Sequence, residues 1–381
     1  MPNKIRVLVV DDAVVMRKLI GDVIASDSAL ELVGVAANGR IALQKIPQVN
    51  PDIITMDVEM PEMDGVQAVR EIRKLYPRMP VIMFSTLTQR GAETTIDALS
   101  AGATDYVTKP ANVGSVGESI NRLKADLVPR LKTHCRGKLV SLPLPTMIKV
   151  PAAVSSLAVN GAGHTPAKVV TARPSGPQQV QVLCVGASTG GPNALADLFQ
   201  SLTRPVPVPV VVVQHMPPVF TRILAERIEK NSRIRCHEAT EGQEIVPGQI
   251  FLAPGGFHLE VVRDGARFRA HLHEGLPENS CRPAVDVLFR SVARSFGSGS
   301  LAVVLTGMGQ DGLRGSESIR EAGGRVIAQD EATSVVWGMP GHVAQAGLAD
   351  AILPLPEIGP EISRRLLVRS GGNQPQGSTC P

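Results

Sequence analysis

The feature that most constrains this chain is an alternation of short, almost wholly apolar runs with longer amphipathic stretches. Continuous hydrophobicity predicts strands buried on both faces. Helix-length stretches between such strands predict parallel strands joined by helical crossovers. In the first part of the chain the five expected strands are IRVLVV (5–10), ELVGVA (31–36), DIITMD (52–57), PVIMFS (80–85) and ATDYV (103–107). We therefore expect a doubly wound, three-layer α/β domain of the flavodoxin-like kind.

The same alternation resumes later in the chain. The further expected strands are VQVLCVG (180–186), VPVVVVQ (208–214), QIFLAP (249–254), FHLEVV (257–262), SLAVVLTG (300–307) and RVIAQD (325–330). They predict a second doubly wound, three-layer domain, which is Rossmann-like. A chain of 381 residues has room for two such domains.

The segment between the two blocks has a different composition. From His134 to Gln179 there is no acidic and no aromatic residue, and repeated prolines interrupt any helix. We expect a first domain over 1–128, a linker over 129–179 that can contain one short docking element, a second domain over 180–368, and a flexible tail over 369–381.

The composition indicates which classes of partner and which cellular compartment to expect. A net charge of +4 with one Trp, two Tyr and eight Phe disfavours nucleic-acid binding. Five scattered cysteines form no C-x-x-C pair, which indicates a reducing cytoplasm. The N-terminus has no signal-peptide pattern and no apolar run reaches about 18 residues, so we expect neither export nor membrane insertion.

Polar side chains end successive strands of the first domain. Asp11 and Asp12 follow the first strand, and Asp57 ends the third. The carboxyl ends of parallel strands share one edge, so these acids should converge, and Mg²⁺ prefers such oxygen ligands. Ser85 ends the fourth strand and Lys109 follows the fifth, and they add a hydroxyl and a cation. A single Asp at a strand end more often caps a helix, but five polar groups at one edge favour a site.

The segments VVDD, MDVEMPEMDG, FST and TKP give residues 5–128 a close resemblance to the receiver domain of two-component response regulators. The resemblance implies that a histidine kinase phosphorylates Asp57. It implies Mg²⁺ bound by Asp12, Asp57 and the backbone carbonyl of Glu59, with Asp11 in support. It also assigns phosphoryl contacts to Ser85 and Lys109, and the aromatic switch position to Tyr106. Ala13 stands where many receivers have Ser.

In the second domain, GASTG (186–190) lies between an expected strand and an expected helix. Small residues around Ser188 allow a tight turn that exposes its hydroxyl, and the helix N-terminus favours a developing oxyanion. A nucleotide-binding loop is the alternative, although Ser188 stands where a second glycine is needed and no G-K-[ST] follows.

His215 and Asp311 follow two other expected strands, so a serine, an imidazole and a carboxylate should meet at one sheet edge. An isolated strand-end His is more often structural. Together the three groups suit nucleophilic acyl chemistry. His215 would take the proton from Ser188, and Asp311 would orient the imidazole.

The loop around Asp311 also fits another function. Gly307, Gly309 and Gly312 spell G-x-G-x-x-G, and Asp330 ends the following strand, as in dinucleotide-binding folds. Asp311, however, would hold a negative charge where a pyrophosphate must bind, which disfavours that interpretation.

The segments GASTGG, QHMPPVFT, FLAPGGFHL, RPAVDVLF, LTGMGQDG and VVWGMP make residues 180–367 similar to the catalytic domain of chemotaxis protein-glutamate methylesterases, the CheB family. The resemblance places the nucleophile, base and acid at Ser188, His215 and Asp311, and oxyanion-side residues at Thr189 and Met308. LPENSC (276–281) departs from the usual run of Asn, Arg and His.

By that resemblance the chain is a cytoplasmic hydrolase with no cofactor in its esterase domain. It would demethylate glutamate γ-methyl esters, and deamidate glutamines, on chemoreceptor helices. Phosphorylation of Asp57 would relieve inhibition by the receiver. The alternatives are a regulator with a DNA-binding output, a nucleotide-dependent oxidoreductase suggested by the glycine loop, and a non-catalytic scaffold.

Overall fold

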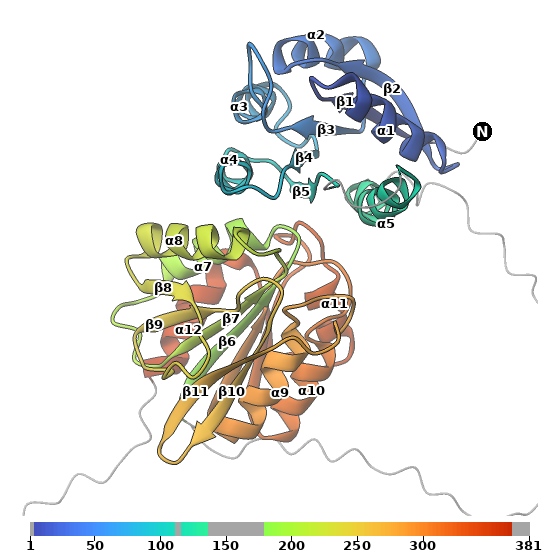
Figure 1. The fold of residues 1–381 in the computed structure, drawn as a ribbon. Coiled ribbons are helices and arrows are strands. Elements are labelled where there is room, and N and C mark those ends of the chain that lie inside the picture. The colour runs from blue at the N-terminus through green and yellow to red at the C-terminus, as the bar shows by residue number, and fades with distance from the viewer. Residues whose placement is uncertain (1–3, 111–115, 136–178, 368–381) are drawn as a thin grey trace, which may run out of the picture.

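The computed structural model describes residues 4–110, 116–135 and 179–367. These residues form two α/β domains, one above the other in Figure 1. The expected linker lies for the most part outside the described residues, and the expected tail lies wholly outside them.

The first domain is a five-stranded sheet in the order β2-β1-β3-β4-β5, and every neighbouring pair is parallel. Its strands are β1 (Ile5–Val10), β2 (Leu30–Ala36), β3 (Ile53–Asp57), β4 (Val81–Ser85) and β5 (Asp105–Thr108). Its helices are α1 (Val14–Ala25), α2 (Gly39–Val49), α3 (Gly65–Leu75), α4 (Gln89–Ser100) and α5 (Val116–His134). This strand order is that of flavodoxin-like folds and confirms the predicted architecture.

Side chains that alternate along β1 enter two separate cores, so the sheet is buried on both faces. Val7 and Val9 pack with α1 and α5, whereas Leu8 and Val10 pack with the helices of the opposite face. This explains why the strand sequences are continuously apolar. Helix α5 continues past the expected domain boundary at Val128 to His134.

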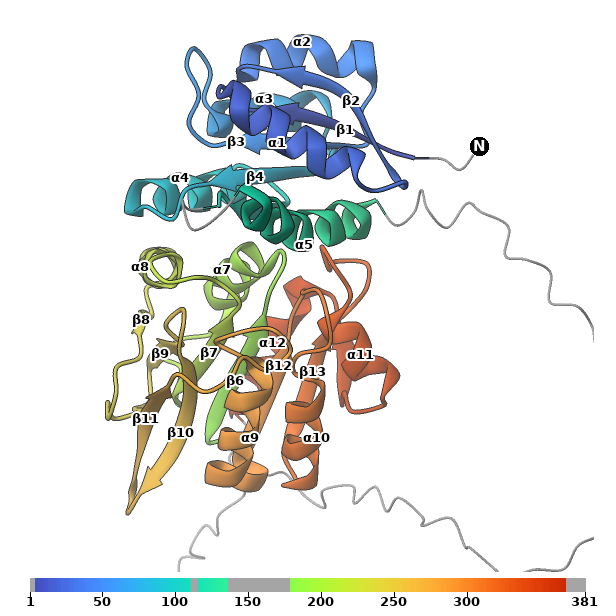
Figure 2. The same cartoon turned by 45° about the vertical axis from the view of Figure 1, so that its right-hand side comes forward.

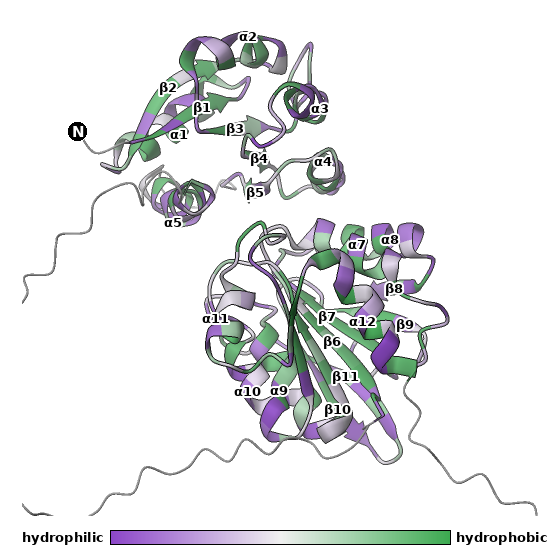
Figure 3. Ribbon diagram, turned by 180° about the vertical axis from the view of Figure 1, so that it is seen from behind, coloured by the Kyte–Doolittle hydropathy of each residue, from purple (hydrophilic) through white to green (hydrophobic). Residues whose placement is uncertain are grey.

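The second domain contains a seven-stranded parallel sheet in the order β14-β13-β12-β6-β7-β9-β8. Its strands are β6 (Val182–Ala187), β7 (Val210–Gln214), β8 (Arg235–Glu238), β9 (Gln249–Leu252), β12 (Ser300–Val304), β13 (Arg325–Gln329) and β14 (Ala351–Leu353). Its helices are α7 (Gly191–Ser201), α8 (Phe220–Ser232), α9 (Val285–Phe296), α10 (Leu313–Glu321), α11 (Met339–Gln345) and α12 (Leu355–Leu367), with a 3-10 turn, η1, at Gly297–Gly299. The predicted doubly wound domain is confirmed, and its central strands are strongly hydrophobic (Figure 3).

One expected strand of the second domain lies outside the main sheet. The segment FHLEVV forms most of β10 (His258–Asp264), which pairs antiparallel with β11 (Arg267–His273) in a separate hairpin. The strand is buried at its start, as at Leu259, and exposed at its end, as at Arg263.

The receiver-like domain packs on the second domain through α4, β5 and α5, and the contact with the second domain is made mainly by α7 and α8 (Figure 2). Buried residues of α4, including Ile96 and Leu99, belong to one continuous apolar cluster with Phe220 and Leu224 of α8. The domains therefore share an apolar interface at the carboxyl edge of the second sheet.

Candidate phospho-acceptor and active sites

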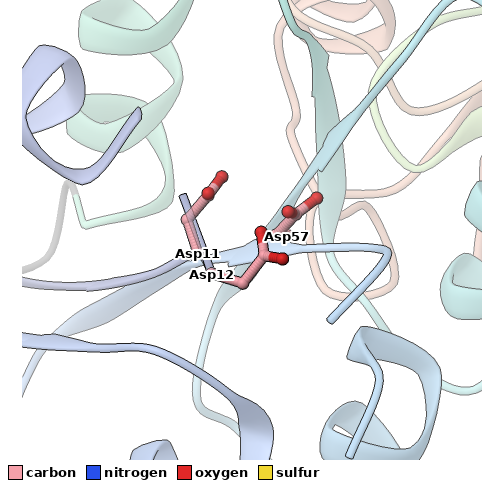
Figure 4. A group of neighbouring side chains, drawn as sticks. All are labelled: Asp11, Asp12 and Asp57. Atoms are coloured by element: carbon pink, nitrogen blue, oxygen red, sulfur yellow. The ribbon is translucent and has the colours of Figure 1, made fainter. Parts of the chain in front are cut away.

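The three acids of the first domain meet at the carboxyl edge of its sheet. Asp11 and Asp12 follow β1, Asp57 ends β3, and one oxygen of each lies within 4.8 Å of the others (Figure 4). Lys109, just after β5, places its Nζ 2.7 Å from Asp57 Oδ2 and 3.1 Å from Asp11 Oδ2. The structure thus brings together the acids and the lysine that the sequence analysis grouped.

Burial dominates the electrostatics of Asp57. It raises the pKa of this carboxyl to about 6, against the lowering effect of Lys109, and the neighbouring charge of Asp11 raises it further. Asp11 Oδ2 is fully buried and accepts no hydrogen bond of good geometry from the described residues. Three neighbouring carboxylates that share the single charge of Lys109 leave excess negative charge, which fits a hard divalent cation.

A cavity of about 250 Å³ opens over this cluster, and its lining includes Asp12, Asp57, Glu59 and Lys109. Ser85 does not line the cavity. Its buried hydroxyl donates to the carbonyls of Thr86 and Gly91, at 3.1 and 3.0 Å. Thr86, which the sequence analysis missed, lines the cavity instead. A phosphoryl contact by Ser85 therefore requires its side chain to rotate.

In the second domain, Ser188 stands on the predicted strand-to-helix turn. Strand β6 ends at Ala187, and α7 begins at Gly191 after Gly190, whose φ of 76° favours glycine. A Cβ on Gly191 would lie 2.0 Å from Gln214 Oε1, so this position needs glycine for close packing. The tight turn leaves Ser188 partly exposed at the sheet edge.

His215 and Asp311 form a close, largely buried pair. His215 follows β7, Asp311 lies in the loop between β12 and α10, and His215 Nε2 is 2.7 Å from Asp311 Oδ2. Burial lowers the pKa of His215, but hydrogen bonding to Asp311 and to Cys281 outweighs it, raising the pKa to about 10. The same pairing lowers the pKa of Asp311 against its desolvation.

Backbone amides and one side chain hold Asp311 in place. Its Oδ2 accepts from Val285 N at 2.7 Å, and its Oδ1 accepts from Asp286 N and Gly312 N at 2.9 and 3.0 Å. Asn279 Nδ2 donates to Asp311 Oδ1 at 3.0 Å. With these donors, the carboxylate is fixed facing the imidazole.

The segment LPENSC supplies two neighbours of the triad that the sequence analysis did not identify. Asn279 contacts Asp311, and Cys281 Sγ lies 3.5 Å from His215 Nδ1. Among the described residues, Cys281 is the hydrogen-bond partner of Nδ1, and the Ser188 hydroxyl has none. The only sequence signal was the departure of this segment from the family pattern.

A cavity of about 460 Å³ joins these groups, and both domains line it. From the second domain come Ser188, Thr189, His215, Cys281 and Met308. From the receiver come Leu99, Asp105, Tyr106, Ala125, Asp126, Pro129 and Arg130. Ser188 and His215 therefore face a space that the receiver closes on one side.

Backbone amides beside Ser188 differ in their availability. Ser188 N donates to Thr306 O at 3.0 Å, so it is not free for an oxyanion. In residues 179–367, the amides of Thr189 and Met308 donate to no acceptor. These are the two positions that the family resemblance assigned to the oxyanion side.

Tyr106 connects the first domain to the second. Its ring stacks on that of Phe220, with centroids 5.1 Å apart and planes 11° from parallel. Thr133 and Met308 also meet across the interface, with Oγ1 3.7 Å from Sδ. The expected switch residue thus lies at the domain interface and lines the cavity around Ser188.

The fold and the two sites define a protein in which a receiver domain is joined to an α/β domain of the hydrolase type. Residues 7–121 match the response regulator receiver domain model, and residues 183–362 match the CheB methylesterase model. No helix in the described ranges has the length and apolarity needed to span a membrane.

Relatives of known name extend over nearly the whole chain. A Nocardioides protein named protein-glutamate methylesterase/protein-glutamine glutaminase is 52% identical over 98% of this chain and 99% of its own length. One of the same name from Trichodesmium erythraeum is 48% identical over 95% of this chain and 99% of its own. The crystal structure of the Thermotoga maritima CheB methylesterase catalytic domain is 40% identical and covers 49% of this chain and 99% of its own, with a TM-score of 0.48. The chain belongs to the protein-glutamate methylesterase/protein-glutamine glutaminase family.

Proposed function

We propose that the protein hydrolyses glutamate γ-methyl esters on chemoreceptor helices through Ser188, His215 and Asp311, and that phosphorylation of Asp57 by a histidine kinase activates it. The observation that carries this proposal is that Ser188 and His215, at the β6 and β7 edges, line one cavity, while the buried Asp311, after β12, pairs with His215. The names of the relatives supply the ester and amide substrates. Four described cysteines are free thiols, which supports a cytoplasmic location.

The first half-reaction forms an acyl-enzyme. Ser188 Oγ attacks the ester carbonyl carbon while its proton passes to His215 Nδ1, because Nε2 is engaged by Asp311. The amides of Thr189 and Met308 are free to stabilise the oxyanion. When the tetrahedral intermediate collapses, the C–O bond to the methoxy group breaks, and that group leaves as methanol with the proton from His215.

The second half-reaction returns the enzyme to its starting state. Water attacks the acyl carbon, His215 takes one water proton, and the Ser188 ester bond breaks to leave a glutamate carboxylate. A glutamine side chain enters the same sequence with ammonia as the leaving group. Both substrates need the imidazole neutral at the moment of attack. Because the pKa of His215 is raised to about 10, only its neutral fraction is active, and hydrolysis should increase as the pH rises toward that value.

The alternative dinucleotide function is not supported by the glycine loop. Gly312 N and Gly315 N, at the start of α10, donate to Asp286 Oδ1 at 2.9 and 2.7 Å. Two buried carboxylates, Asp286 and Asp311, thus occupy the helix N-terminus where a pyrophosphate would bind. Asp330 accepts hydrogen bonds from Thr333 within its own turn, as an ordinary strand-end acid does.

The receiver chemistry requires a divalent cation. Asp12, Asp57 and the carbonyl of Glu59 would hold Mg²⁺, with Asp11 in support, and the ion supplies charge neutralisation for phosphoryl transfer to Asp57. Lys109 would then pair with the phosphoryl oxygens, and Ser85 would turn toward them. The phosphoryl group adds a charge of about −1.5 to −2 and so changes the electrostatic environment of Lys109.

The docked receiver is inhibitory on steric grounds. A helix with its side chains is about 10–12 Å in diameter, whereas the cavity at Ser188 is about 460 Å³ and is closed on one side by the receiver. A glutamyl side chain carried on an intact helix therefore reaches Ser188 only after α4 and α5 move away. Phosphorylation would favour that open state.

The proposal is tested by methanol release from methylated receptor membranes, with and without a small phosphodonor. Ser188→Ala should release no methanol above background. Ser318→Ala, which changes a serine hydrogen-bonded only to its own helix α10, should match the unaltered protein. Wild-type release by Ser188→Ala would contradict the triad assignment.

The regulatory half has a separate test. Asp57→Ala should keep unstimulated hydrolysis and lose stimulation by the phosphodonor. Stimulation that survives in Asp57→Ala would contradict the assignment of Asp57, while leaving the triad unaffected.

A further inference from the structure

The thiol of Cys281 is held against the catalytic imidazole. Its Sγ lies 3.5 Å from His215 Nδ1, the ring nitrogen not engaged by Asp311. An imidazole at this distance can act as the base that takes up the thiol proton when the sulfur attacks an electrophile.

The backbone fixes this thiol in position. Glu278 and Cys281 exchange two backbone hydrogen bonds, of 3.1 and 2.9 Å, and Asn279 and Ser280 between them both have positive φ. Arg290 clamps the Glu278 carboxylate with two contacts, of 2.7 and 2.6 Å. This tight turn directs Asn279 to Asp311 and Cys281 to His215.

The thiol is also accessible. Cys281 is partly exposed and lines two cavities, the one of about 460 Å³ at Ser188 and a neighbouring one of about 400 Å³. The other described cysteines are Cys135, Cys184 and Cys236, which are 8%, 0% and 2% exposed. Burial also raises the pKa of the Cys184 and Cys236 thiols, which keeps them protonated and unreactive.

We propose that Cys281 is a modification site at which a small soft electrophile, such as hydrogen peroxide, reacts with the sulfur and switches off the hydrolase. The second part rests on the proposed function of Ser188 and His215. The first part, selective reaction at Cys281, depends only on the thiol and imidazole pair.

The reaction with peroxide balances as follows. In the neutral form of His215, the thiol proton passes to Nδ1, and the sulfur attacks one peroxide oxygen. An S–O bond forms as the O–O bond breaks, and the hydroxide that leaves takes up a proton to become water. Cys281 becomes a sulfenic acid, oxidised by two electrons, and peroxide is reduced by two; an added thiol reductant reverses this step.

Modification blocks hydrolysis because both functions use the same nitrogen. Ser188 must deliver its proton to His215 Nδ1, which is the atom that Cys281 Sγ approaches. Any group added to the sulfur occupies the cavity between the imidazole and the incoming ester. Ser188 and the substrate then lose access to the base.

The labelling experiment uses the full-length protein and iodoacetamide, whose iodide leaves as the sulfur–carbon bond forms. Peptide mass spectrometry follows each cysteine separately near neutral pH. Cys281 should be alkylated at least about tenfold faster than Cys380 of the same chain, because His215 can take up the thiol proton as the sulfur attacks. Equal or slower alkylation at Cys281 would overturn the proposal.

Two variants identify the role of the imidazole. His215→Gln should slow alkylation of Cys281 by about tenfold. His342→Gln, at an exposed position of α11, should leave the rate unchanged. If His215→Gln fails to fold, the ratio of the Cys281 rate to the Cys380 rate in the unaltered protein decides, and a ratio near one would contradict the pair.

A separate experiment measures the hydrolytic activity. In a Cys380→Ser background, iodoacetamide should remove most hydrolysis, and Cys281→Ser protein should keep its own untreated activity after the same exposure. Labelling of Ser188→Ala protein at the unaltered rate separates the two proposals, since that variant has no hydrolysis to lose. Loss of activity in treated Cys281→Ser would overturn the assignment of inactivation to this thiol.

Discussion

The ring of Tyr106, in the receiver, lies parallel to the ring of Phe220, the first residue of α8 in the catalytic domain. Tyr106 also lines the cavity that contains Ser188. One side chain therefore contributes both to domain docking and to closure of the candidate active site. Around it, Asn193 Nδ2 donates to Leu99 O at 2.8 Å, and Arg227 pairs with Asp97 at 3.0 Å.

Tyr106→Ala should raise unstimulated hydrolysis. A stacked aromatic pair contributes about 0.5–1.5 kcal/mol beyond its buried area, which corresponds to a roughly two- to tenfold shift from closed to open protein. Methanol release without phosphodonor measures this directly. Tyr106→Phe keeps the ring and should retain the low unstimulated rate; an unchanged rate in Tyr106→Ala would show that the stack does not restrain the receiver.

The pairing of His215 with Asp311 should appear in the pH dependence of stability. The pKa of His215 is raised from 6.5 to about 10, so the folded state binds this proton more tightly than the unfolded state. The resulting stabilisation is fully present below pH 6.5 and is lost as the pH rises through about 10. His215→Gln should therefore be less stable than the unaltered protein near pH 6, and the difference should shrink near pH 10.

Denaturant unfolding at several pH values measures this difference. Other groups titrate near pH 10 in both proteins, so the difference between them isolates His215. His342→Gln, on the exposed side of α11, serves as the control for the loss of an imidazole elsewhere in the same domain. A His215→Gln effect that is constant from pH 6 to pH 10 would argue against a stabilising imidazolium.

Mg²⁺ should raise the melting temperature of the receiver through Asp57. A ligand at 100 times its dissociation constant stabilises the folded state by about 2.7 kcal/mol. Burial raises the pKa of Asp57 to about 6, so the carboxylate needed for the metal is lost as the pH falls through that value. The melting shift should be present near pH 7.5 and small near pH 5.

Asp57→Asn provides the comparison for Mg²⁺ binding. It keeps the shape of the side chain but removes the charge, and it should lose most of the Mg²⁺-dependent shift at pH 7.5. Because a carboxylate with a raised pKa opposes folding above that pKa, the variant should also be more stable than the unaltered protein without metal. An equal Mg²⁺ shift in both proteins would place the ion elsewhere.

The elements that could be predicted from the sequence are those whose burial gives them a distinctive composition. The strands of the receiver were placed within one or two residues, because each is covered on both faces and is continuously apolar. The turn at Ser188 was equally predictable, since its glycines are required by close contacts and a positive φ. Strand β8, with the polar sequence RCHE, and the three-residue β14 carry no such signal and were missed.

Contacts made by loops were much less predictable. The neighbours of His215 and Asp311 in LPENSC depend on consecutive positive φ values at Asn279 and Ser280, which sequence patterns do not specify for these residues. The rotamer of Ser85 was likewise not predictable. Its hydroxyl donates to two backbone carbonyls, although another rotamer would turn it toward the adjacent cavity. The ends of the predicted strands identify the sheet edge at which a site lies. The hydrogen-bond partners that loop residues supply can be identified only from the structure.

Asn279 should support hydrolysis by positioning Asp311 rather than by touching the ester. Its Nδ2 donates to Asp311 Oδ1 at 3.0 Å and to Asp286 Oδ2 at 2.9 Å, and so bridges two buried carboxylates. Burial raises the pKa of Asp286 to about 6, and the nearby charge of Asp311 raises it further. Losing a hydrogen bond to a charged group costs about 1.5–3 kcal/mol.

Asn279→Ala should therefore lower kcat by about tenfold or more with little change in KM. Without the bridging amide both carboxylates take up protons at higher pH, so the acidic limb of the kcat profile should move to higher pH. Asn279→Gly tolerates the positive φ and should show the same loss, which separates the amide from backbone strain. Asn231→Ala, on the exposed face of α8, should match the unaltered protein. An unchanged acidic limb in both Asn279 variants would mean that the bridge does not tune Asp311.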